Sequence, residues 1–376
     1  MHPLILISSL ATGGAERVTV SFLCHEKIKK SEVLFCTVTD RHDSPLSDEL
    51  SKNGVIRYDL SARRLADPFA LLRLIMLIRR ERIDIVHAHG QDASILAAIA
   101  KRFLNVPLVI TRHVLVEPSE NWRQRLRAWF ALAAIRSANA VVAVSSAVAD
   151  RLADTAHLKR SDIRIIPNGI EIEKFNRPEL KVHRQDFRTE LGFGPKDHIV
   201  LVPAVLRKGK GHEVLLQSIP AIRSRIPTAY VLIAGSGECE DELRFKARSL
   251  GNAVIFLGER DDIPKLLTAC DLVVLPSIEE ALPTVLIEAA AASLPVLATC
   301  VWGVKEVVAH DRTGILVPPN DPIDLGEAVV KILSNHNLAR KFGEEAYKLA
   351  HERFSIDLQI EKTLELWSDV IKGSSR

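Results

Sequence analysis

Residues 272–298, LVVLPSIEEALPTVLIEAAAASLPVLA, contain the most informative pattern of the chain. Short apolar runs at 272–275 and 296–298 enclose a longer apolar segment that follows Pro283. The two runs have the length of buried strands, and the segment between them has the proline start that is typical of a helix. A strand, a helix and a second strand in this order predict a parallel sheet that helices cover on both faces.

The same alternation runs through the whole chain in two series. Strands are predicted at 3–9, 83–88, 108–111 and 140–145 in the first series, and at 199–203, 230–234, 254–257, 272–275 and 296–298 in the second. Two such series predict an α/β protein of two doubly wound, Rossmann-like domains. Ligands of these sheets bind beyond the carboxyl ends of the strands, so the chemistry is expected in the strand-end loops of two facing domains, around one cleft.

The turn sequence IPNG at 166–169 lies between the two series and favours a sharp reversal of the chain. We therefore expect an N-terminal domain over 1–170 and a C-terminal domain over 171–355. The last segment, 356–376, is predicted to be an amphipathic helix that either caps the second domain or, as we expect, returns to the first. Its apolar positions at helical spacing are Ile356, Ile360, Leu364, Trp367 and Ile371.

The composition is that of a soluble globular protein, with 47% apolar and 26% charged residues. No leader is evident and the five cysteines form no C-x-x-C pair, so we expect a cytoplasmic protein without a disulfide framework, with Cys270 and Cys300 in the core. Residues 1–175 carry 25 Lys and Arg against 19 Asp and Glu. This excess suits a phosphate-bearing acceptor or a lipid surface, or reflects unevenly solvated faces; nucleic acid is not an expected partner.

A basic, glycine-containing loop, LRKGKGH at 206–212, follows the first strand of the second series. Arg207 and Lys210 suit a diphosphate, because Arg binds oxyanions bidentately and Lys acts as a point charge. The spacing is not that of an ATP-type P-loop. The next strand is followed by Gly235-Ser236-Gly237, which lacks the third glycine of a dinucleotide fingerprint and so disfavours a nicotinamide dehydrogenase.

Two glutamates accompany the helix that is predicted within 272–298. Pro283 is the expected first helical residue, with Glu280 in the loop ahead of it and Glu288 about two turns further along. The free N–H groups of a helix start can bind sugar oxygens or phosphate, and a carboxylate can accept hydrogen bonds from vicinal sugar hydroxyls. Two surface glutamates are the alternative interpretation.

Glycines and histidines lie at the strand ends of the first series. Gly13-Gly14 comes where a helix starts after the first strand, and it serves either a phosphate or only a tight turn. His87-Ala88-His89 and Thr111-Arg112-His113 end two successive strands, which makes His113 a candidate site residue. No carboxylate or cysteine at ligand spacing accompanies these histidines, so we expect no zinc site.

In this order the motifs resemble the family 4 retaining glycosyltransferases with the GT-B fold. The resemblance covers nearly the whole chain. The motifs that carry it are GGAE at 13–16, HAH at 87–89, TRH at 111–113, PNG at 167–169, Arg207 with Lys210 and Gly211, GSG at 235–237, the pair Glu280 and Glu288, GVKEVV at 303–308 and GILVPP at 314–319.

The resemblance implies a role for each matching position. Glu288 is expected to hold the ribose of the donor nucleotide, and Glu280 with the backbone after it the transferred sugar. Arg207 and Lys210 are expected to neutralise the diphosphate, while His113 lies by the sugar. The donor-binding residues implied in this way are Gly14, Arg207, Lys210, Gly235, Glu280, Leu282, Pro283, Thr284 and Glu288, and the catalytic ones are His113, Glu280, Arg207 and Lys210.

The chain departs from the family pattern at three places. Ala281 stands where the family usually has a glycine, between the glutamate and a Phe/Leu-Pro pair. Arg207 lies three residues before Lys210 instead of five, so Lys208 could compete for its role. Trp302 replaces the first of two glycines that are common before the Glu306 segment.

We therefore expect a retaining transferase that moves a hexose or N-acetylhexosamine from a nucleotide sugar, most commonly UDP-linked in this family, to a saccharide or lipid-linked acceptor in polysaccharide or lipopolysaccharide synthesis. No Asp-x-Asp motif is present, so we expect neither a metal ion nor another cofactor. Residues 121–130, NWRQRLRAWF, could contact an anionic membrane from the cytoplasmic side. A sugar-nucleotide epimerase and a non-catalytic nucleotide-sugar-binding module on the same scaffold remain the alternatives.

Overall fold

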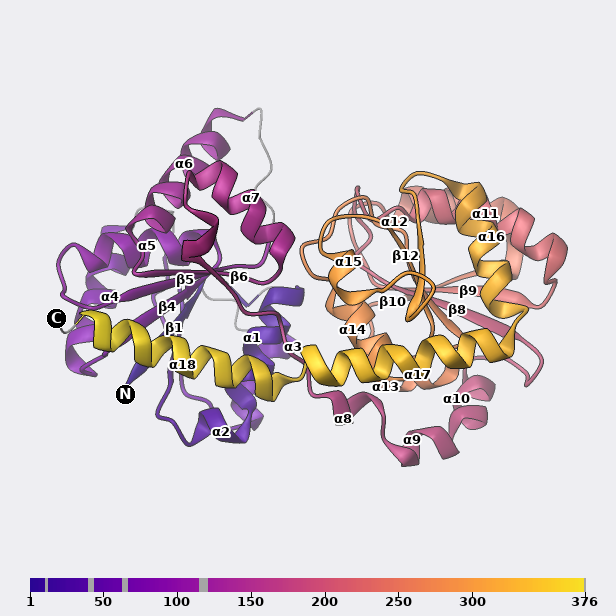
Figure 1. The fold of residues 1–376 in the computed structure, drawn as a ribbon, viewed down its shortest axis with the longest axis horizontal. Helices are drawn as coiled ribbons and strands as arrows, with labels where there is room; N and C mark the ends of the chain where they lie inside the picture. The colour runs from indigo at the N-terminus through magenta and orange to yellow at the C-terminus, as the bar shows by residue number, and fades with distance from the viewer. Residues whose placement is uncertain (11–12, 40–43, 63–66, 115–120, 375–376) are drawn as a thin grey trace. The chain divides into compact units, whose positions relative to one another are not determined.

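The computed structural model describes residues 1–10, 13–39, 44–62, 67–114 and 121–374. The chain divides into two compact units, of which unit 1 comprises Met1–Gly169 with Ile356–Arg376 and unit 2 comprises Ile170–Ser355. Each unit is built around one sheet with helices on both of its faces (Figure 1). The predicted α/β class with two Rossmann-like sheets is confirmed.

Unit 1 contains a seven-stranded sheet in the order β3-β2-β1-β4-β5-β6-β7, and all of its neighbouring pairs are parallel. The chain starts in the middle of the sheet and winds outward in both directions, as a doubly wound sheet does. The strands are β1 (Pro3–Ile7), β2 (Leu34–Thr37), β3 (Arg57–Asp59), β4 (Ile85–His89), β5 (Leu108–Arg112), β6 (Ala140–Ala143) and β7 (Ile163–Ile165).

The helices of unit 1 connect successive strands and cover the sheet. Local sequence sets where they begin: Asp67 Oδ1 accepts a hydrogen bond from the Phe69 N–H at 3.0 Å, and Pro68 follows at the first helical position. They are α1 (Gly14–Cys24), α2 (Glu26–Lys29), α3 (Pro45–Lys52), α4 (Pro68–Arg80), α5 (Gln91–Lys101), α6 (Trp122–Ser137), α7 (Ser146–Ala156), the 3₁₀ turn Arg160–Asp162 and α18 (Ile356–Ser374).

The last helix, α18, packs on unit 1, on the same side of the sheet as α1 (Figure 1). Ile356, Ile360 and Trp367 are buried in the core that α18 shares with α1, α3 and the sheet. The Trp367 ring meets the Phe22 ring edge to face, with 6.2 Å between the ring centroids. The amphipathic pattern of the segment therefore has its partner surface within unit 1.

Unit 2 repeats the topology with six parallel strands in the order β10-β9-β8-β11-β12-β13. Its strands are β8 (His198–Pro203), β9 (Ala229–Ala234), β10 (Val254–Gly258), β11 (Leu272–Leu275), β12 (Val296–Thr299) and β13 (Gly314–Val317). Its helices are α8 (Ile172–Phe175), α9 (Pro178–Val182), α10 (Arg184–Glu190), α11 (His212–Arg225), α12 (Glu240–Ala247), the 3₁₀ segment Arg248–Ala253, α13 (Ile263–Ala269), α14 (Thr284–Ala291), α15 (Val304–Val307), α16 (Pro322–Leu333) and α17 (His336–Arg353).

Two expectations about single residues are wrong. Pro283 caps α14 instead of starting it: its ψ of 101° is extended, and its carbonyl accepts the first helical hydrogen bond, from the Leu286 N–H at 3.1 Å. Cys270 is buried, but Cys300 is exposed, because it lies one residue beyond β12 where the chain leaves the sheet. No helix among the described residues combines the length and the apolar character needed to cross a bilayer.

Candidate functional site

Three of the predicted donor-binding residues of unit 2 lie in loops at the carboxyl ends of neighbouring strands. Arg207 and Lys210 lie between β8 and α11, and Glu280 lies between β11 and α14. Because β8 and β11 are adjacent in the sheet, their loops emerge side by side. Ligands of doubly wound sheets bind beyond the carboxyl ends of the strands. We call this end of the unit 2 sheet, with its loops, the strand-end edge.

Lys210 and Glu280, which are seventy residues apart in the chain, form an ion pair. The distance from Lys210 Nζ to Glu280 Oε1 is 2.7 Å, and both side chains are largely buried, with 15% and 11% of their surfaces exposed. The Ser277 hydroxyl donates a second hydrogen bond to the same oxygen, also at 2.7 Å. The structure thus brings together Lys210, which was predicted to bind the diphosphate, and Glu280, which was predicted to bind the sugar.

Gly211 makes this pairing possible. It has a φ of +69°, and a β-carbon at this position would lie 1.8 Å from the Pro276 carbonyl oxygen. The loop after β8 therefore lies directly on the loop after β11, and the Ile278 N–H donates to the Gly209 carbonyl at 2.9 Å. A side chain at Gly211 would push the two loops apart.

Gly235 and Gly237 give the loop after β9 a similar close approach to the loop after β8. β-Carbons on these glycines would lie 2.1 Å from the Ala204 oxygen and 2.4 Å from the Leu206 oxygen. The Leu206 N–H also donates to the Ser236 carbonyl at 2.9 Å. The described contacts of this motif are therefore with the protein backbone, and a donor contact of Gly235 stays a prediction.

Arg207 differs from Lys210 in its surroundings. Its side chain is exposed, and its guanidinium group makes no ion pair or hydrogen bond with the residues that the structure describes. Lys208 is exposed as well, and its charge helps to lower the pKa of Glu242, after the larger effect of Lys246. Arg207 therefore presents a charge that is open to a ligand, whereas the charge of Lys210 is already paired.

Helix α14 begins at Thr284, directly after the Glu280 loop. Leu282 and Pro283 are buried and Thr284 is half-buried. Glu288 lies four residues after Thr284, just over one helical turn, and is buried with 8% of its surface exposed. An ionised carboxylate is rarely buried to this extent unless polar groups contact it. The burial of Glu288 excludes the interpretation of a surface glutamate, and Glu280 is largely buried too.

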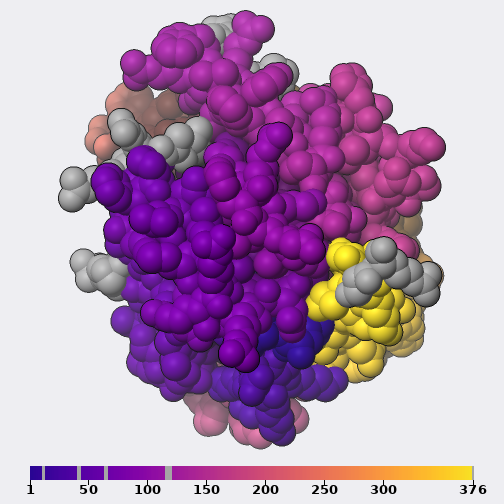
Figure 2. Space-filling model, turned by 90° about the vertical axis from the view of Figure 1, so that its left-hand side faces the viewer, coloured from indigo at the N-terminus to yellow at the C-terminus, as the bar shows by residue number. Residues whose placement is uncertain are grey.

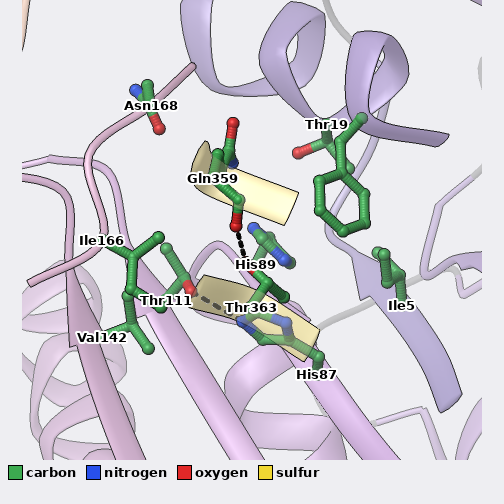
Figure 3. A pocket seen from close by; sticks show the side chains of 11 residues that line it. Ile5, Thr19, His87, His89, Thr111, Val142, Ile166, Asn168, Gln359 and Thr363 are labelled. Atoms are coloured by element: carbon green, nitrogen blue, oxygen red, sulfur yellow. Dashed lines mark hydrogen bonds between the residues drawn. The ribbon is translucent and has the colours of Figure 1, made fainter. Parts of the chain in front are cut away.

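In unit 1, the two histidine motifs lie at the ends of β4 and β5, and three of their residues, His87, His89 and Thr111, line a pocket beneath α18 (Figure 3). The Trp367 indole N–H of α18 donates to His87 Nδ1 at 3.1 Å. An indole N–H is only a donor, so His87 carries its proton on Nε2 and donates to Thr111 Oγ1 at 2.7 Å. Burial, followed by the neighbouring His113, lowers the pKa of His87 to about 3, so this ring is neutral at pH 7.

His113 is bonded to His89 and not to His87. The distance from His89 Nδ1 to His113 Nε2 is 2.9 Å, and the two rings are stacked with 5.2 Å between their centroids. Burial, with Arg112 as a second cause, lowers the pKa of His113 to about 4, and burial also holds the pKa of His89 well below its usual value. Both rings are thus neutral at pH 7, and one of the two facing nitrogens donates to the other.

Gly14 begins α1, where its backbone is exposed at the helix start. Gly13 precedes it with extended backbone, and a β-carbon on Gly13 would lie 2.3 Å from the Glu16 carboxylate. Burial raises the pKa of Glu16 above its ordinary value. Gly13 therefore leaves room for a partly buried acid within the first turn of α1.

Sequence reasoning missed Ser277, His89 and Trp367 as parts of these sites. Ser277 lies two residues beyond the end of β11, and this position at a strand end was the available signal. Trp367 was predicted only as an apolar position of a helix. Its bond to His87 joins residues that are 280 positions apart, which spacing along the chain does not reveal.

Two family models match the chain. Residues 12–174 match the family model described as Glycosyltransferase Family 4, and residues 183–349 match the one described as Glycosyl transferases group 1. An uncharacterized glycosyltransferase of Methanocaldococcus jannaschii is 27% identical over 309 residues, which are 79% of this chain and 78% of that protein. The UDP-Gal:alpha-D-GlcNAc-diphosphoundecaprenol alpha-1,3-galactosyltransferase of Escherichia coli is 25% identical over 316 residues, which are 82% of this chain and 81% of the other.

A solved structure shares the fold over almost the full length. Anabaena HepE, crystallised in complex with UDP and glucose, superposes with a TM-score of 0.86 at 23% identity, over 98% of this chain and 100% of that chain. At this identity the likeness shows the fold alone.

Proposed function

Because the chain belongs to the GT-B-fold glycosyltransferases of the family 4 type, we propose that it transfers a hexose or N-acetylhexosamine from a UDP-linked donor to a saccharide or lipid-linked acceptor, with retention at the anomeric carbon and without a metal ion. The proposal assigns donor binding to unit 2 and acceptor binding to unit 1. Polysaccharide or lipopolysaccharide synthesis is the setting that suits such an acceptor. No observation favours the epimerase or the non-catalytic module.

The observation that carries the proposal is the contact of Lys210 with Glu280 at the strand-end edge of unit 2. A nucleotide sugar needs cations for its diphosphate and a carboxylate for its sugar hydroxyls, and this edge supplies both within 2.7 Å of each other. A relative supports a nucleotide-sugar donor, because the Escherichia coli protein is named for a UDP-linked sugar.

The proposed chemistry follows from where charge develops. Breaking the bond between the anomeric carbon and the phosphate leaves negative charge on the departing diphosphate and positive charge on the sugar. Arg207 and Lys210 stabilise the negative charge, as a metal ion does in other enzymes. Retention then follows from attack of the acceptor on the face that the diphosphate leaves, with the leaving phosphate taking the acceptor's proton.

Thermal unfolding with a panel of nucleotide sugars tests donor binding and metal independence together. A ligand that binds only the folded state raises the unfolding temperature by mass action. We expect UDP and at least one UDP-sugar to raise it in excess EDTA, and to raise it by the same amount after magnesium or manganese is added. Transfer from that donor should also survive EDTA.

The possible failures of this experiment are distinguishable. If no nucleotide sugar changes the unfolding temperature, the proposed donor class is wrong. If the shift or the transfer appears only after a divalent cation is added, metal independence is wrong while donor binding stands. Donor that is converted without any requirement for an acceptor would indicate an epimerase.

The acceptor side of the proposal rests on α6. Trp122, Leu126 and Trp129 lie on one stripe of this helix, with 66%, 48% and 58% of their surfaces exposed. Arginines lie between them, and α6 lies at the top of unit 1 in Figures 1 and 2. Exposed tryptophans among arginines suit the interface of an anionic bilayer, where a lipid-linked acceptor is held.

Flotation with anionic liposomes tests this surface. We expect the protein to float with the liposomes at low salt and Arg123→Glu/Arg125→Glu to lose tenfold or more in affinity, since each basic residue near the surface contributes about 1 kcal/mol. Arg127 is left unchanged because it pairs with Asp92. The matched control is Arg340→Glu/Lys341→Glu on α17, which should bind normally; equal binding of both variants, or no binding by the wild type, contradicts the proposal.

A further inference from the structure

Three large apolar side chains are exposed at the strand-end edge of unit 2. Val205, Ile278 and Trp302 follow β8, β11 and β12, and 47%, 42% and 48% of their surfaces are exposed. These three strands are neighbours in the sheet. The edge that carries the Lys210–Glu280 pair therefore also carries exposed apolar groups, which is the usual mixture of a small-molecule site.

Trp302 differs from the other three tryptophans of the chain. Trp367 is buried, and Trp122 and Trp129 contact Arg123 and a neighbouring aromatic ring, respectively. The Trp302 ring makes no ring–ring or cation–π contact within the part of the chain that the structure describes. An indole ring with nearly half of its surface in water and no partner has a face that is free for a ligand.

The backbone of Trp302 is strained, with a φ of +25°. A bulky residue with positive φ is a genuine outlier, and such strain persists only where the surroundings fix it. The surroundings do so here: the Cys300 N–H donates to the Val317 carbonyl at 2.7 Å, and the Val304 N–H donates to the Val301 carbonyl at 3.0 Å. Glycine would adopt this conformation without strain, so the indole ring is what tryptophan adds at this position.

The Trp302 loop is attached to the Glu280 loop. The peptide group between Trp302 and Gly303 donates its N–H to the Glu280 carbonyl at 3.0 Å. A β-carbon on Gly303 would lie 1.8 Å from the Ala281 carbonyl oxygen, so the two backbones are in direct contact. Any movement of the Glu280 loop therefore moves the attachment point of the indole.

We propose that Trp302 is a specificity-determining residue that packs its indole ring against the apolar face of the donor's pyranose ring. The hydroxyls of the same ring donate hydrogen bonds to Glu280. A pyranose presents C–H groups on one face and hydroxyls around its rim, so it fits an aromatic face beside a carboxylate. This inference rests on the proposed function, because it requires a nucleotide-sugar donor at this edge. It adds that sugar selection comes from a side chain on the β12 loop.

Calorimetric titration with UDP and with UDP-glucose tests the inference in Trp302→Gly. UDP is expected to bind this variant and the wild type equally, whereas UDP-glucose binds the variant about 2- to 10-fold more weakly, which is the range of a lost aromatic contact. Glycine relieves the positive φ, so the unfolding temperature should stay the same or rise. Trp302→Phe should keep part of the sugar-dependent affinity.

The control is Phe245→Ala, which removes an exposed aromatic ring from α12 and should leave both affinities unchanged. Unchanged UDP-glucose affinity in Trp302→Gly overturns the inference. A change confined to the KM for the acceptor, measured in transfer kinetics, also overturns it, because it would place the indole ring against the acceptor sugar. Failure of the wild type to bind UDP and every UDP-sugar of the panel would instead refute the proposed function.

Discussion

Replacing Lys210 with alanine is expected to lower the rate of sugar transfer by a hundredfold or more. The ammonium group of Lys210 contributes most as the diphosphate departs, because the full negative charge develops on the diphosphate only then. Loss of one such electrostatic donor costs about 10²–10³ in kcat, or roughly 3–4 kcal/mol of transition-state stabilisation. The measurement is kcat and KM with the UDP-sugar that thermal unfolding identifies.

Two neighbouring cations provide the comparison for this result. Arg207→Ala should cause a loss of similar size, because the structure leaves the guanidinium group of Arg207 exposed and without a described partner. Lys208→Ala should be nearly silent. If instead Arg207→Ala has normal turnover and Lys208→Ala is slow, the phosphate contact belongs to Lys208.

The ion pair with Glu280 requires a further control, since Lys210→Ala also removes a contact that holds Glu280. Residues in contact are expected to couple, and a double-mutant cycle measures that coupling. If Lys210 serves only to position Glu280, then Lys210→Ala has no further effect in the Glu280→Ala protein. We expect most of the rate loss to persist in that background, which assigns it to the diphosphate.

The second large effect is expected at Glu280 and Glu288, which should act on different halves of the donor. Glu280 contacts Lys210 and Ser277 at the strand-end edge, while Glu288 is buried further along α14. Glu280→Ala should leave UDP affinity nearly unchanged, yet depress turnover and weaken the preference among UDP-sugars. Competition between two UDP-sugars measures that preference, and a Glu280→Ala protein that keeps it contradicts the assignment to the sugar.

Much of the fold could be predicted because buried parallel strands leave continuous apolar runs. The strands that were not predicted show the limit of this signal. β3 has the sequence RYD with no fully buried residue, and β7 has IRI with an exposed arginine. These two strands lie at the edges of the sheet, where one side has no neighbour and polar residues are tolerated. β2 and β13 were not predicted either, although they are as long as the predicted β11 and β12.

The site could be predicted only to the level of its loops. Strand-end positions and family resemblance placed Lys210 and Glu280 in strand-end loops, but not in loops that touch. Their pairing depends on the order of the strands and on the close approach of Gly211 to Pro276, and spacing along the chain reveals neither. Likewise, an apolar stripe predicted that α18 buries Trp367, while the indole's hydrogen bond to His87 arises from tertiary packing. Cys300 was misplaced for the related reason that an apolar run does not mark where a strand ends.

Unit 2 is expected to bind the nucleotide half of the donor through Glu288. Calorimetric titration of wild type and Glu288→Ala with UDP alone tests this assignment. A buried carboxylate that accepts two ribose hydroxyls leaves them unpaired when it is removed, at about 1–3 kcal/mol, so UDP should bind about 5- to 140-fold more weakly. Thermal unfolding of the same samples shows whether the variant is folded. If a folded Glu288→Ala protein binds UDP with the affinity of the wild type, Glu288 does not hold the ribose of the donor.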